Sequence, residues 1–321
     1  MKIAVCVKEV PDTTAEKKID PSSFRLNRDS GDRMLNAFDL NAIEQALRLK
    51  EAAGDGEVVL ISMGPSRALE SIRKGLAMGA DRAVLVADDA AAGSDLVATS
   101  YVLAAALQRE APDLVLFGQQ ASDGDGAVMW AAVAERLRMP VISQISELEV
   151  AGGTVTAKRQ TEFGYDKIST PLPAVLAVSD ALNEPRYPSL KGIMGAKKKQ
   201  QDVLSLADAG ADSARAGLAG SRTAVKALAP PPSRGDNQKI DDDGSGAQTL
   251  IEAVEARFRV LEDTLAMLGA FKPLKRHHQR QGRRAKGRLA QGPGRLQPAE
   301  LRQDTHDHAR LRPAGRRPAI D

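Results

Sequence analysis

Histidine is absent from the first 274 of the 321 residues, because the histidines all lie near the end of the chain, at His277, His278, His306 and His308. The imidazole of histidine is the commonest general base and the commonest protein ligand for metal ions. A single cysteine, Cys6, also excludes an internal disulfide and a cysteine-based metal cluster. Chemistry in residues 1–274 therefore requires carboxylates or a bound cofactor, and we expect no metal site.

Long apolar runs are missing too, and aromatic residues make up only 3% of the sequence. No run reaches the roughly 18–20 residues that a membrane span requires. The segment MKIAVCVKEVPD at the start lacks the apolar core and the small-residue cleavage site of a signal peptide. We therefore expect a cytoplasmic protein that does not insert into membranes, with a core built from Ala, Val, Leu and Ile.

Positive charge is concentrated near the C-terminal end. From Lys275 onward the chain has 13 Lys and Arg but only 4 Asp and Glu, whereas residues 1–274 have 32 basic and 38 acidic residues. Residues 271–321 are rich in Arg, Gln, Gly and Pro, with too few aliphatic residues to fold alone. They are predicted to be a disordered basic tail or an aberrant, frame-shifted end. Such a tail is also compatible with nucleic-acid binding, although we expect no DNA partner.

Strand-like and helix-like segments alternate through the first 140 residues. Short apolar runs predict strands at Ile3–Val7, Val58–Ser62, Ala83–Ala87 and Leu114–Phe117. Apolar residues at helical spacing predict helices at Asn41–Ala53, Ala68–Ala77, Leu96–Gln108 and Ala127–Leu137. Strands that alternate with helices over short connections indicate a doubly wound α/β fold, with a mainly parallel sheet covered on both faces.

The pattern changes after Pro140. It predicts a hairpin of Glu147–Val150 and Val155–Arg159, a strand at Ala174–Val178 and a short basic helix at Ser189–Lys199. Together with the first 140 residues, these elements form one predicted domain, residues 1–204.

A C-terminal extension follows this domain. Residues 205–245 are rich in Ala, Gly, Ser, Pro and Asp, which is typical of a flexible linker. Residues 246–270 carry apolar side chains at helical spacing and predict an amphipathic helix. The apolar face of such a helix needs a partner surface, which is either the body of this chain or another subunit.

Seven segments, in this order and spacing, match one known family. They are Val5–Asp12, Asn36–Glu51, Ser62–Pro65, Gly75–Leu85, Asp113–Asp125, Leu172–Val175 and Leu182–Lys199. The last segment, LNEPRYPSLKGIMGAKKK, is the most specific of them. Over about residues 1–205 the chain resembles the beta subunit of electron-transfer flavoproteins.

This resemblance implies a fold of the adenine-nucleotide-binding type, related to the adenine nucleotide alpha hydrolases. It implies a heterodimer with a larger alpha subunit, which holds most of a shared FAD. That FAD carries electrons from acyl-CoA-type or other flavin dehydrogenases to an electron-transfer flavoprotein–quinone oxidoreductase or a similar acceptor. The beta subunit would be an electron carrier without catalytic residues of its own. It binds AMP in the common version of the family and a second FAD, at the same place, in electron-bifurcating relatives.

The candidate nucleotide site consists of four segments that follow predicted strands, because ligands of doubly wound sheets bind beyond the carboxyl ends of the strands. The resemblance assigns to it Cys6, Asn36, Ala37, Phe38, Asp39, Met63, Gly118, Gln119, Gln120, Ala121, Ser122, Asp123, Gly124, Asp125, Gly126, Ala127, Val128 and Met129. The segment from Gly118 to Met129 is the main candidate, since its glycines allow close approach and the next helix begins with free amides. We expect residues 36–39 to precede the first helix.

Three features of this site leave alternatives open. Many relatives have Thr and Gln after the Asp-Gly-Asp sequence, where this chain has Gly126, Ala127 and Val128, so phosphate binding would depend more on backbone amides. The segments Val10–Thr13 and Lys18–Pro21 resemble the bifurcating branch somewhat more than the simple one, which keeps a second FAD as the alternative to AMP. Phe38 would either contact the flavin of the alpha subunit or be an ordinary core residue.

Partner contacts are predicted in two places. Residues 182–199 correspond to the family's recognition loop, with Leu190 as the apolar side chain that inserts into the dehydrogenase. Its neighbours in this interface would be Arg186, Tyr187, Lys197, Lys198 and Lys199, of which the three lysines would attract an acidic partner. Asp166 aligns with an acidic residue that contacts the FAD domain of the alpha subunit.

Two other classes of protein are weighed against an electron carrier. A nucleotide-hydrolysing or adenylating enzyme would have a phosphate loop such as GxxxxGK[ST] after the first strand, where this chain has VKEVPDTT. A stand-alone adenine-nucleotide-binding signalling protein would not need the segment LNEPRYPSLKGIM.

Overall fold

The computed structural model of the protein describes residues 1–28, 31–229 and 244–267, with side chains up to residue 259. The chain divides into two units, Met1–Pro231 and Pro232–Asp321. Within the described ranges, no helix combines the length and the apolar character that are needed to cross a membrane.

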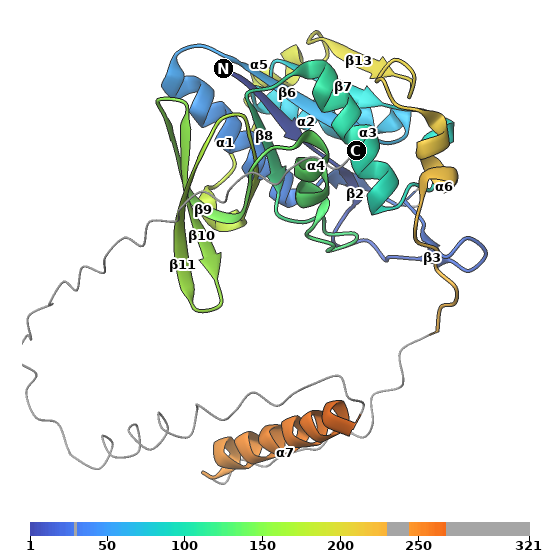
Figure 1. Cartoon of the computed structure of the whole chain (residues 1–321), viewed down its shortest axis with the longest axis vertical. Coiled ribbons are helices and arrows are strands. Elements are labelled where there is room, and N and C mark those ends of the chain that lie inside the picture. The colour runs from blue at the N-terminus through green and yellow to red at the C-terminus, as the bar shows by residue number, and fades with distance from the viewer. Residues whose placement is uncertain (29–30, 230–243, 268–321) are drawn as a thin grey trace, which may run out of the picture. The chain divides into compact units, whose positions relative to one another are not determined.

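The first unit is built on a nine-stranded sheet with the order β11-β10-β9-β12-β8-β1-β6-β7-β13 (Figure 1). Its strands are β1 Lys2–Cys6, β6 Glu57–Met63, β7 Arg82–Val86, β8 Leu114–Gly118, β9 Val141–Ala151, β10 Thr154–Thr161, β11 Gly164–Pro171, β12 Ala174–Val178 and β13 Gln201–Leu204. The seven strands β9-β12-β8-β1-β6-β7-β13 are neighbours in this order and pair in parallel. β10 pairs antiparallel with β9, and β11 pairs antiparallel with β10, so these two strands extend the sheet beyond β9. The predicted mainly parallel sheet is confirmed.

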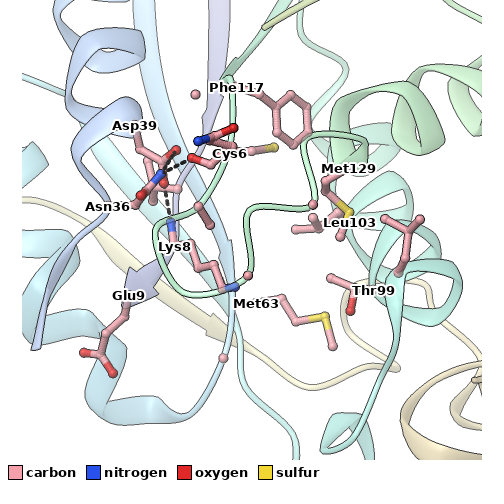
Figure 2. Close-up of a pocket in the computed structure, with 18 of the residues that line it drawn as sticks. Cys6, Lys8, Glu9, Asn36, Asp39, Met63, Thr99, Leu103, Phe117 and Met129 are labelled. Atoms are coloured by element: carbon pink, nitrogen blue, oxygen red, sulfur yellow. Dashed lines mark hydrogen bonds between the residues drawn. The ribbon is translucent and has the colours of Figure 1, made fainter. Parts of the chain in front are cut away.

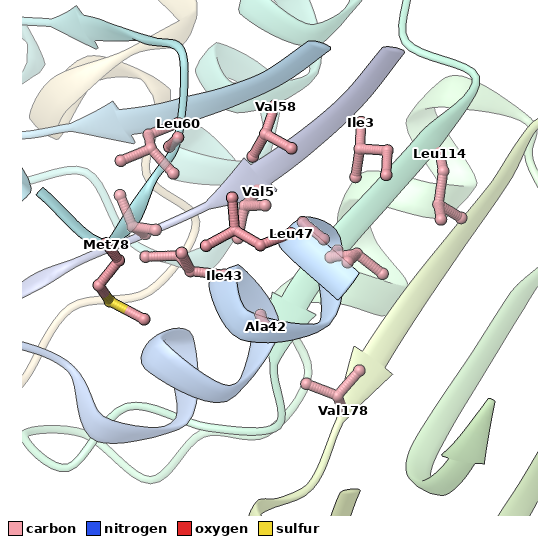
Figure 3. Packing of buried hydrophobic residues seen from close by; sticks show 14 of the residues in the cluster. Ile3, Val5, Ala42, Ile43, Leu47, Val58, Leu60, Met78, Leu114 and Val178 are labelled. Carbon is pink, nitrogen blue, oxygen red and sulfur yellow. The ribbon is translucent and has the colours of Figure 1, made fainter. Parts of the chain in front are cut away.

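Helices cover both faces of this sheet. They are α1 Ala37–Ala53, α2 Leu69–Met78, α3 Leu96–Glu110, α4 Met129–Leu137 and α5 Leu190–Ala196. Side chains alternate along β1, so Ile3 and Val5 pack with α1 and α2, while Ala4 and Cys6 pack with α3 and α4. Figure 3 shows Ile43 and Leu47 of α1 beside β1 in the first of these two cores. The doubly wound arrangement predicted from the sequence is therefore present.

Helix α1 begins four residues earlier than predicted, so residues 37–39 belong to its first turn and do not precede the helix. The cause lies at Asn36, whose carbonyl accepts hydrogen bonds from the amides of Asp39 and Leu40 at 3.1 and 3.3 Å. The helix ends at Gly54, which has a left-handed φ of 72° that glycine adopts easily. Capping contacts of this kind, and not the apolar spacing, set the ends of the helix.

A long connection between β1 and α1 contains two small two-stranded sheets. In one, β2 Glu9–Pro11 pairs with β5 Arg33–Leu35, and in the other β3 Ile19–Asp20 pairs with β4 Arg25–Leu26. We call residues 12–28 of this connection the strap. These strands are only two or three residues long, too short to leave a periodic pattern in the sequence.

The flexible linker predicted for residues 205–245 is wrong for its first part. Residues 205–221 include a 3-10 turn at Ser213–Arg215 and the short helix α6 Gly217–Gly220. The buried residues of this part are Leu206, Ala209, Ala211, Ala216, Gly217 and Gly220. Its small residues pack closely, since a Cβ at Gly217 would lie 2.1 Å from the carbonyl oxygen of Ala90. A composition typical of linkers here serves close packing instead.

The second unit contains helix α7, Gly246–Met267, at the place where the amphipathic pattern predicts a helix. Leu250, Ile251, Val254 and Phe258 of α7 are exposed. The partner surface predicted for this helix stays a prediction. The predictions for residues 230–243 and 268–321, which include the basic tail, lie outside the described residues.

Candidate functional site

A cavity of about 540 Å³ opens at the carboxyl ends of β1, β6 and β8. Cys6, Met63 and Phe117, which lie at or next to the ends of these strands, are on its wall (Figure 2). Parallel strands place their carboxyl ends at one edge of the sheet, and doubly wound proteins bind their ligands there.

Most residues nominated from the sequence line this cavity. They are Cys6, Asn36, Asp39, Met63, Gly118, Gln119, Gln120, Ala121, Gly124, Gly126, Ala127, Val128 and Met129. The residues that do not line it are Ala37, Phe38, Ser122, Asp123 and Asp125. Phe38 is half-buried and belongs to neither hydrophobic core. The side chain of Asp123 instead contacts Lys8 and Arg28. Cofactor binding by these residues stays a prediction.

The cavity also contains charged residues that the sequence analysis did not nominate, namely Lys8, Glu9, Arg28, Arg67 and Asp95. Lys8 and Glu9 come shortly after the end of β1, and this position beyond a central parallel strand is a signal that could have found them. Arg28 lies on the strap, far in sequence from any predicted strand end, and has no such signal. Tertiary structure alone brings it to the site.

Asn36 and Asp39 connect three elements at the floor of the cavity. Lys8 donates its backbone amide to Asp39 Oδ2 at 2.8 Å, and Asn36 Nδ2 donates to Asp39 Oδ1 at 2.9 Å. Asn36 Nδ2 also donates to the carbonyl oxygen of Gln120 at 2.8 Å, and Asn36 Oδ1 accepts from the amide of Ser122 at 3.2 Å. The end of β1, the first turn of α1 and the loop after β8 are thereby held together (Figure 2).

Gly118 lies where α1 meets the end of β8. A Cβ at this position would be 2.5 Å from Asp39 Oδ1, 2.6 Å from the carbonyl carbon of Phe38 and 2.7 Å from the amide of Asp39. The absence of a side chain at Gly118 therefore allows α1 to pack closely against the end of β8. The sequence instead predicts that the glycines of this loop allow close approach of a ligand. Gly124 and Gly126 have no atom within 4 Å of such a Cβ, so they leave the loop open toward a ligand.

Asp123 holds the same loop from behind. Its side chain is fully buried and accepts hydrogen bonds from Lys8 Nζ at 2.7 Å and from Arg28 Nε and Nη2 at 2.9 and 2.8 Å. Burial raises the pKa of Asp123, but the Lys8 ammonium and then the Arg28 guanidinium outweigh burial and lower this pKa overall. Lys17 adds a bond from its ammonium to the carbonyl oxygen of Ser122 at 2.8 Å. The loop is therefore fixed by a charged carboxylate.

The wall of the cavity offers two kinds of contact. One wall is apolar and is formed by Met63, Leu103, Phe117 and Met129 (Figure 2). The backbone amides of residues 126–128, which directly precede Met129 in the same loop, have no acceptor within the described part of the chain. These amides precede α4, and the beginning of a helix favours negative charge. An apolar wall with a few convergent polar groups is typical of small-molecule sites.

Burial dominates the ionisation of Asp39. It raises the pKa of this carboxyl group from 3.8 to about 7, although hydrogen bonds from Asn36 and from the amide of Lys8 favour the carboxylate. Burial, followed by the neighbouring Asp39 charge, raises the pKa of the Cys6 thiol as well. Cys6 is thus a protonated thiol on the cavity wall near neutral pH.

The raised pKa of Asp39 predicts a pH-dependent stability. Between about pH 4 and pH 7 the folded protein keeps a proton that the unfolded chain has already lost, so the free energy of unfolding falls as the pH rises. The slope from this group approaches about 1.4 kcal/mol per pH unit. Urea unfolding of the ligand-free chain at pH 5 and pH 6.5 measures it. Asp39→Asn should lose this part of the slope, and Asp166→Asn, at an exposed carboxylate, should keep it. Equal slopes for all three proteins would contradict the prediction.

The predicted docking segment is exposed at its tip and fixed at both ends. Tyr187, Leu190 and Met194 are 93%, 80% and 77% exposed. Arg186 is instead bound within the chain, where Nε donates to Glu44 Oε2 at 2.7 Å and Nη2 donates to Glu51 Oε2 at 3.0 Å. These ion pairs fix the start of the segment on α1.

The other end of the segment is fixed on α2. Lys199 donates to the carbonyl oxygens of Leu76 and Ala80 at 2.9 and 2.5 Å, so it caps α2, whereas Lys197 and Lys198 are exposed. A Cβ at Gly192 would lie 2.3 Å from the carbonyl oxygen of Ala77, so this glycine lets α5 pack directly on α2.

These features define a class of protein. A doubly wound sheet with a cavity at the carboxyl ends of its central strands belongs to the α/β proteins that bind a ligand at that edge. Within this class, residues 24–209 match the family described as the electron transfer flavoprotein domain.

Curated relatives agree with this match. The electron transfer flavoprotein subunit beta of Mycobacterium tuberculosis strain H37Rv is 40% identical over 260 residues, which are 79% of this chain and 98% of the relative. That of Megasphaera elsdenii is 41% identical over 263 residues, covering 79% and 96%. The caffeyl-CoA reductase-Etf complex subunit CarD of Acetobacterium woodii is 40% identical over 241 residues, covering 75% and 92%.

The chain belongs to the electron-transfer flavoprotein family and, within it, to the beta subunits. The resemblance found in the sequence is confirmed, and the function of the chain lies in flavoprotein electron transport.

Proposed function

We propose that this chain is the small subunit of a heterodimeric electron-transfer flavoprotein and that its cavity holds AMP. The larger alpha-type subunit would hold most of the FAD, which takes electrons from acyl-CoA-type or other flavin dehydrogenases and passes them to a quinone oxidoreductase or similar acceptor. The observation that carries the AMP assignment is the cavity itself, which joins free amides at residues 126–128 to an apolar wall.

The free amides and the apolar side chains of the cavity suit the two parts of a nucleotide. The amides before α4 and the positive end of this helix would receive the phosphate. Met63, Leu103, Phe117 and Met129 would contact the base, because flat heteroaromatic rings are favourable against apolar and sulfur-containing side chains. In this role the nucleotide is structural, and the protein contributes binding and no bond-making step. The flavin supplies the redox chemistry.

The nucleotide and flavin content of the purified heterodimer tests this function. The chain is coexpressed with an alpha-type subunit, and released nucleotides are separated by chromatography while flavin is measured by absorbance. We expect one FAD and one AMP per heterodimer. A chain that copurifies with no flavin-containing subunit and turns over ATP alone would contradict the proposal and favour the enzyme class.

A second FAD in place of AMP is the other candidate. The cavity is also lined by Gly64 and Pro65 after β6 and by Asp95 and Thr99 at the beginning of α3. These residues are not needed to contact AMP, so they could contact the additional part of a larger ligand such as FAD. The same residues that would hold AMP would then hold the adenosine part of this FAD. Two flavins and no AMP per heterodimer would select this candidate.

Partner contacts complete the proposal. Leu190 would be the side chain that docks into a dehydrogenase, with Tyr187, Lys197 and Lys198 around it, since all four are exposed on or beside α5. Asp166, exposed on β11, would contact the FAD domain of the alpha subunit. We also propose a cytoplasmic location for the heterodimer.

A further inference from the structure

The part of the loop whose backbone amides are free has no side-chain donor. Residues 126–128 are Gly, Ala and Val, which offer a phosphate only their backbone amides. Lys8, from the end of β1, and Arg28, from the strap, reach this cavity together with Gly124 and Gly126. Two cationic side chains from segments that are distant in sequence therefore line the same cavity as residues 126–128, whose own side chains cannot bind a phosphate.

Asp123 positions both cations without neutralising both. Lys8 Nζ and the Nε and Nη2 atoms of Arg28 contact its carboxylate at 2.7, 2.9 and 2.8 Å. The carboxylate is fully buried, whereas the side chains of Lys8 and Arg28 are 44% and 41% exposed. Arg28 Nη1 has no acceptor in the described part of the chain. Two positive charges against one negative charge leave this group with one excess positive charge.

The other charged residues of the cavity wall are already engaged. The Glu9 carboxylate lies 3.4 Å from Arg67 Nε and accepts a hydrogen bond from the Ser71 hydroxyl at 2.8 Å. The Asp95 carboxylate accepts from the amides of Ala98 and Arg222 at 3.0 and 2.7 Å. Neither carboxylate is left to pair with Lys8 or Arg28. The third carboxyl group of the wall, that of Asp39, accepts from the Lys8 amide and from Asn36, and burial raises its pKa to about 7. The excess positive charge of the cation pair therefore faces the cavity.

We propose that Lys8 and Arg28 form a cation pair that binds the phosphate group of the nucleotide, with Asp123 as the residue that positions the pair. The proposal rests on nucleotide binding in this cavity and assigns a side-chain contact that residues 126–128 cannot make. Guanidinium and ammonium groups make strong charge-assisted hydrogen bonds to phosphate. The pair thus gives the site its preference for a nucleotide over the corresponding nucleoside.

The test compares AMP with adenosine, which differ only in the phosphate group. Binding of each compound to the nucleotide-depleted heterodimer is measured by calorimetry for the wild-type protein and for Arg28→Gln. We expect the variant to bind AMP about tenfold to a hundredfold more weakly and to bind adenosine with unchanged affinity. Arg28→Lys should recover part of the preference for AMP, because it restores the charge without the bidentate fork.

Lys17→Gln is the matched control. It removes another bond from the strap to the same loop, but Lys17 does not line the cavity, so its preference for AMP should equal that of the wild type. Equal losses of AMP and adenosine binding in Arg28→Gln would overturn the proposal, because they would show that Arg28 only holds the loop. A wild-type heterodimer that binds neither compound would instead overturn the nucleotide function itself. These two failures are distinguishable.

Discussion

Replacing Gly118 by alanine is expected to lower the free energy of unfolding by about 3 kcal/mol, the upper part of the range for an overpacked core. The added methyl group would lie within 2.7 Å of Asp39 Oδ1, the carbonyl carbon of Phe38 and the amide of Asp39. Two of these atoms belong to the backbone of α1, which cannot move without disturbing the hydrogen bonds at Asn36. Urea unfolding followed by circular dichroism measures the loss, and AMP binding should fall with it.

Gly124→Ala is the matched control for this change. It places the same methyl group on the same loop, but no atom lies within 4 Å of the new Cβ. We therefore expect a change in the free energy of unfolding within about 0.5 kcal/mol. If Gly118→Ala and Gly124→Ala unfold at the same urea concentration, the close packing of α1 against β8 at Gly118 does not contribute to the free energy of unfolding as predicted.

Leu190→Ala is expected to slow electron transfer from an acyl-CoA dehydrogenase to the heterodimer by about thirtyfold at low dehydrogenase concentration. A single apolar side chain that is buried at the centre of a small interface contributes about 2 kcal/mol or more to binding. Leu190 is 80% exposed in this chain, so its removal leaves no cavity in the fold. Flavin reduction in a stopped-flow spectrophotometer, with the dehydrogenase and its substrate, measures the rate.

Two controls accompany this experiment. Leu218→Ala removes a leucine of similar exposure, 71%, from α6, and the rate should stay within about twofold of the wild type. The flavin spectrum and the thermal stability of Leu190→Ala should match those of the wild type, since the side chain supports neither. Unchanged kinetics in Leu190→Ala would remove Leu190 from the docking surface.

The fold was predictable because its central strands and helices have strong periodic patterns. The apolar runs at β1, β6, β7 and β8 led to a parallel sheet, and helical spacing led to α1 through α4. β13 was missed, because only four residues of the edge strand contact the sheet and they carry no apolar run. The composition of residues 205–221 predicts a linker, because the alanines and glycines that allow close packing resemble those of flexible segments.

The candidate site was predictable where a residue follows a strand and not where tertiary structure supplies it. Cys6, Met63 and the loop after β8 lie at strand ends, which topology alone brings together. Arg28 reaches the cavity only through the strap and its contact with Asp123. The contacts of Arg186 with Glu44 and of Lys199 with the end of α2 could not be predicted, because they depend on the tertiary structure. Partner docking by these two residues stays a prediction.

The position of β1 has a consequence for the kinetics of folding. This strand begins at the second residue, yet its register pairs Lys2 with Glu57 on β6 and Ile3 with Leu114 on β8. Contacts between residues so far apart in sequence require large loops to close first, which slows the folding of parallel sheets. During synthesis, the apolar segment KIAVC has no partner strand until β6 has left the ribosome, and it is paired on both sides only after β8 has followed. We therefore expect this segment to be the part of the nascent chain that most needs protection from aggregation.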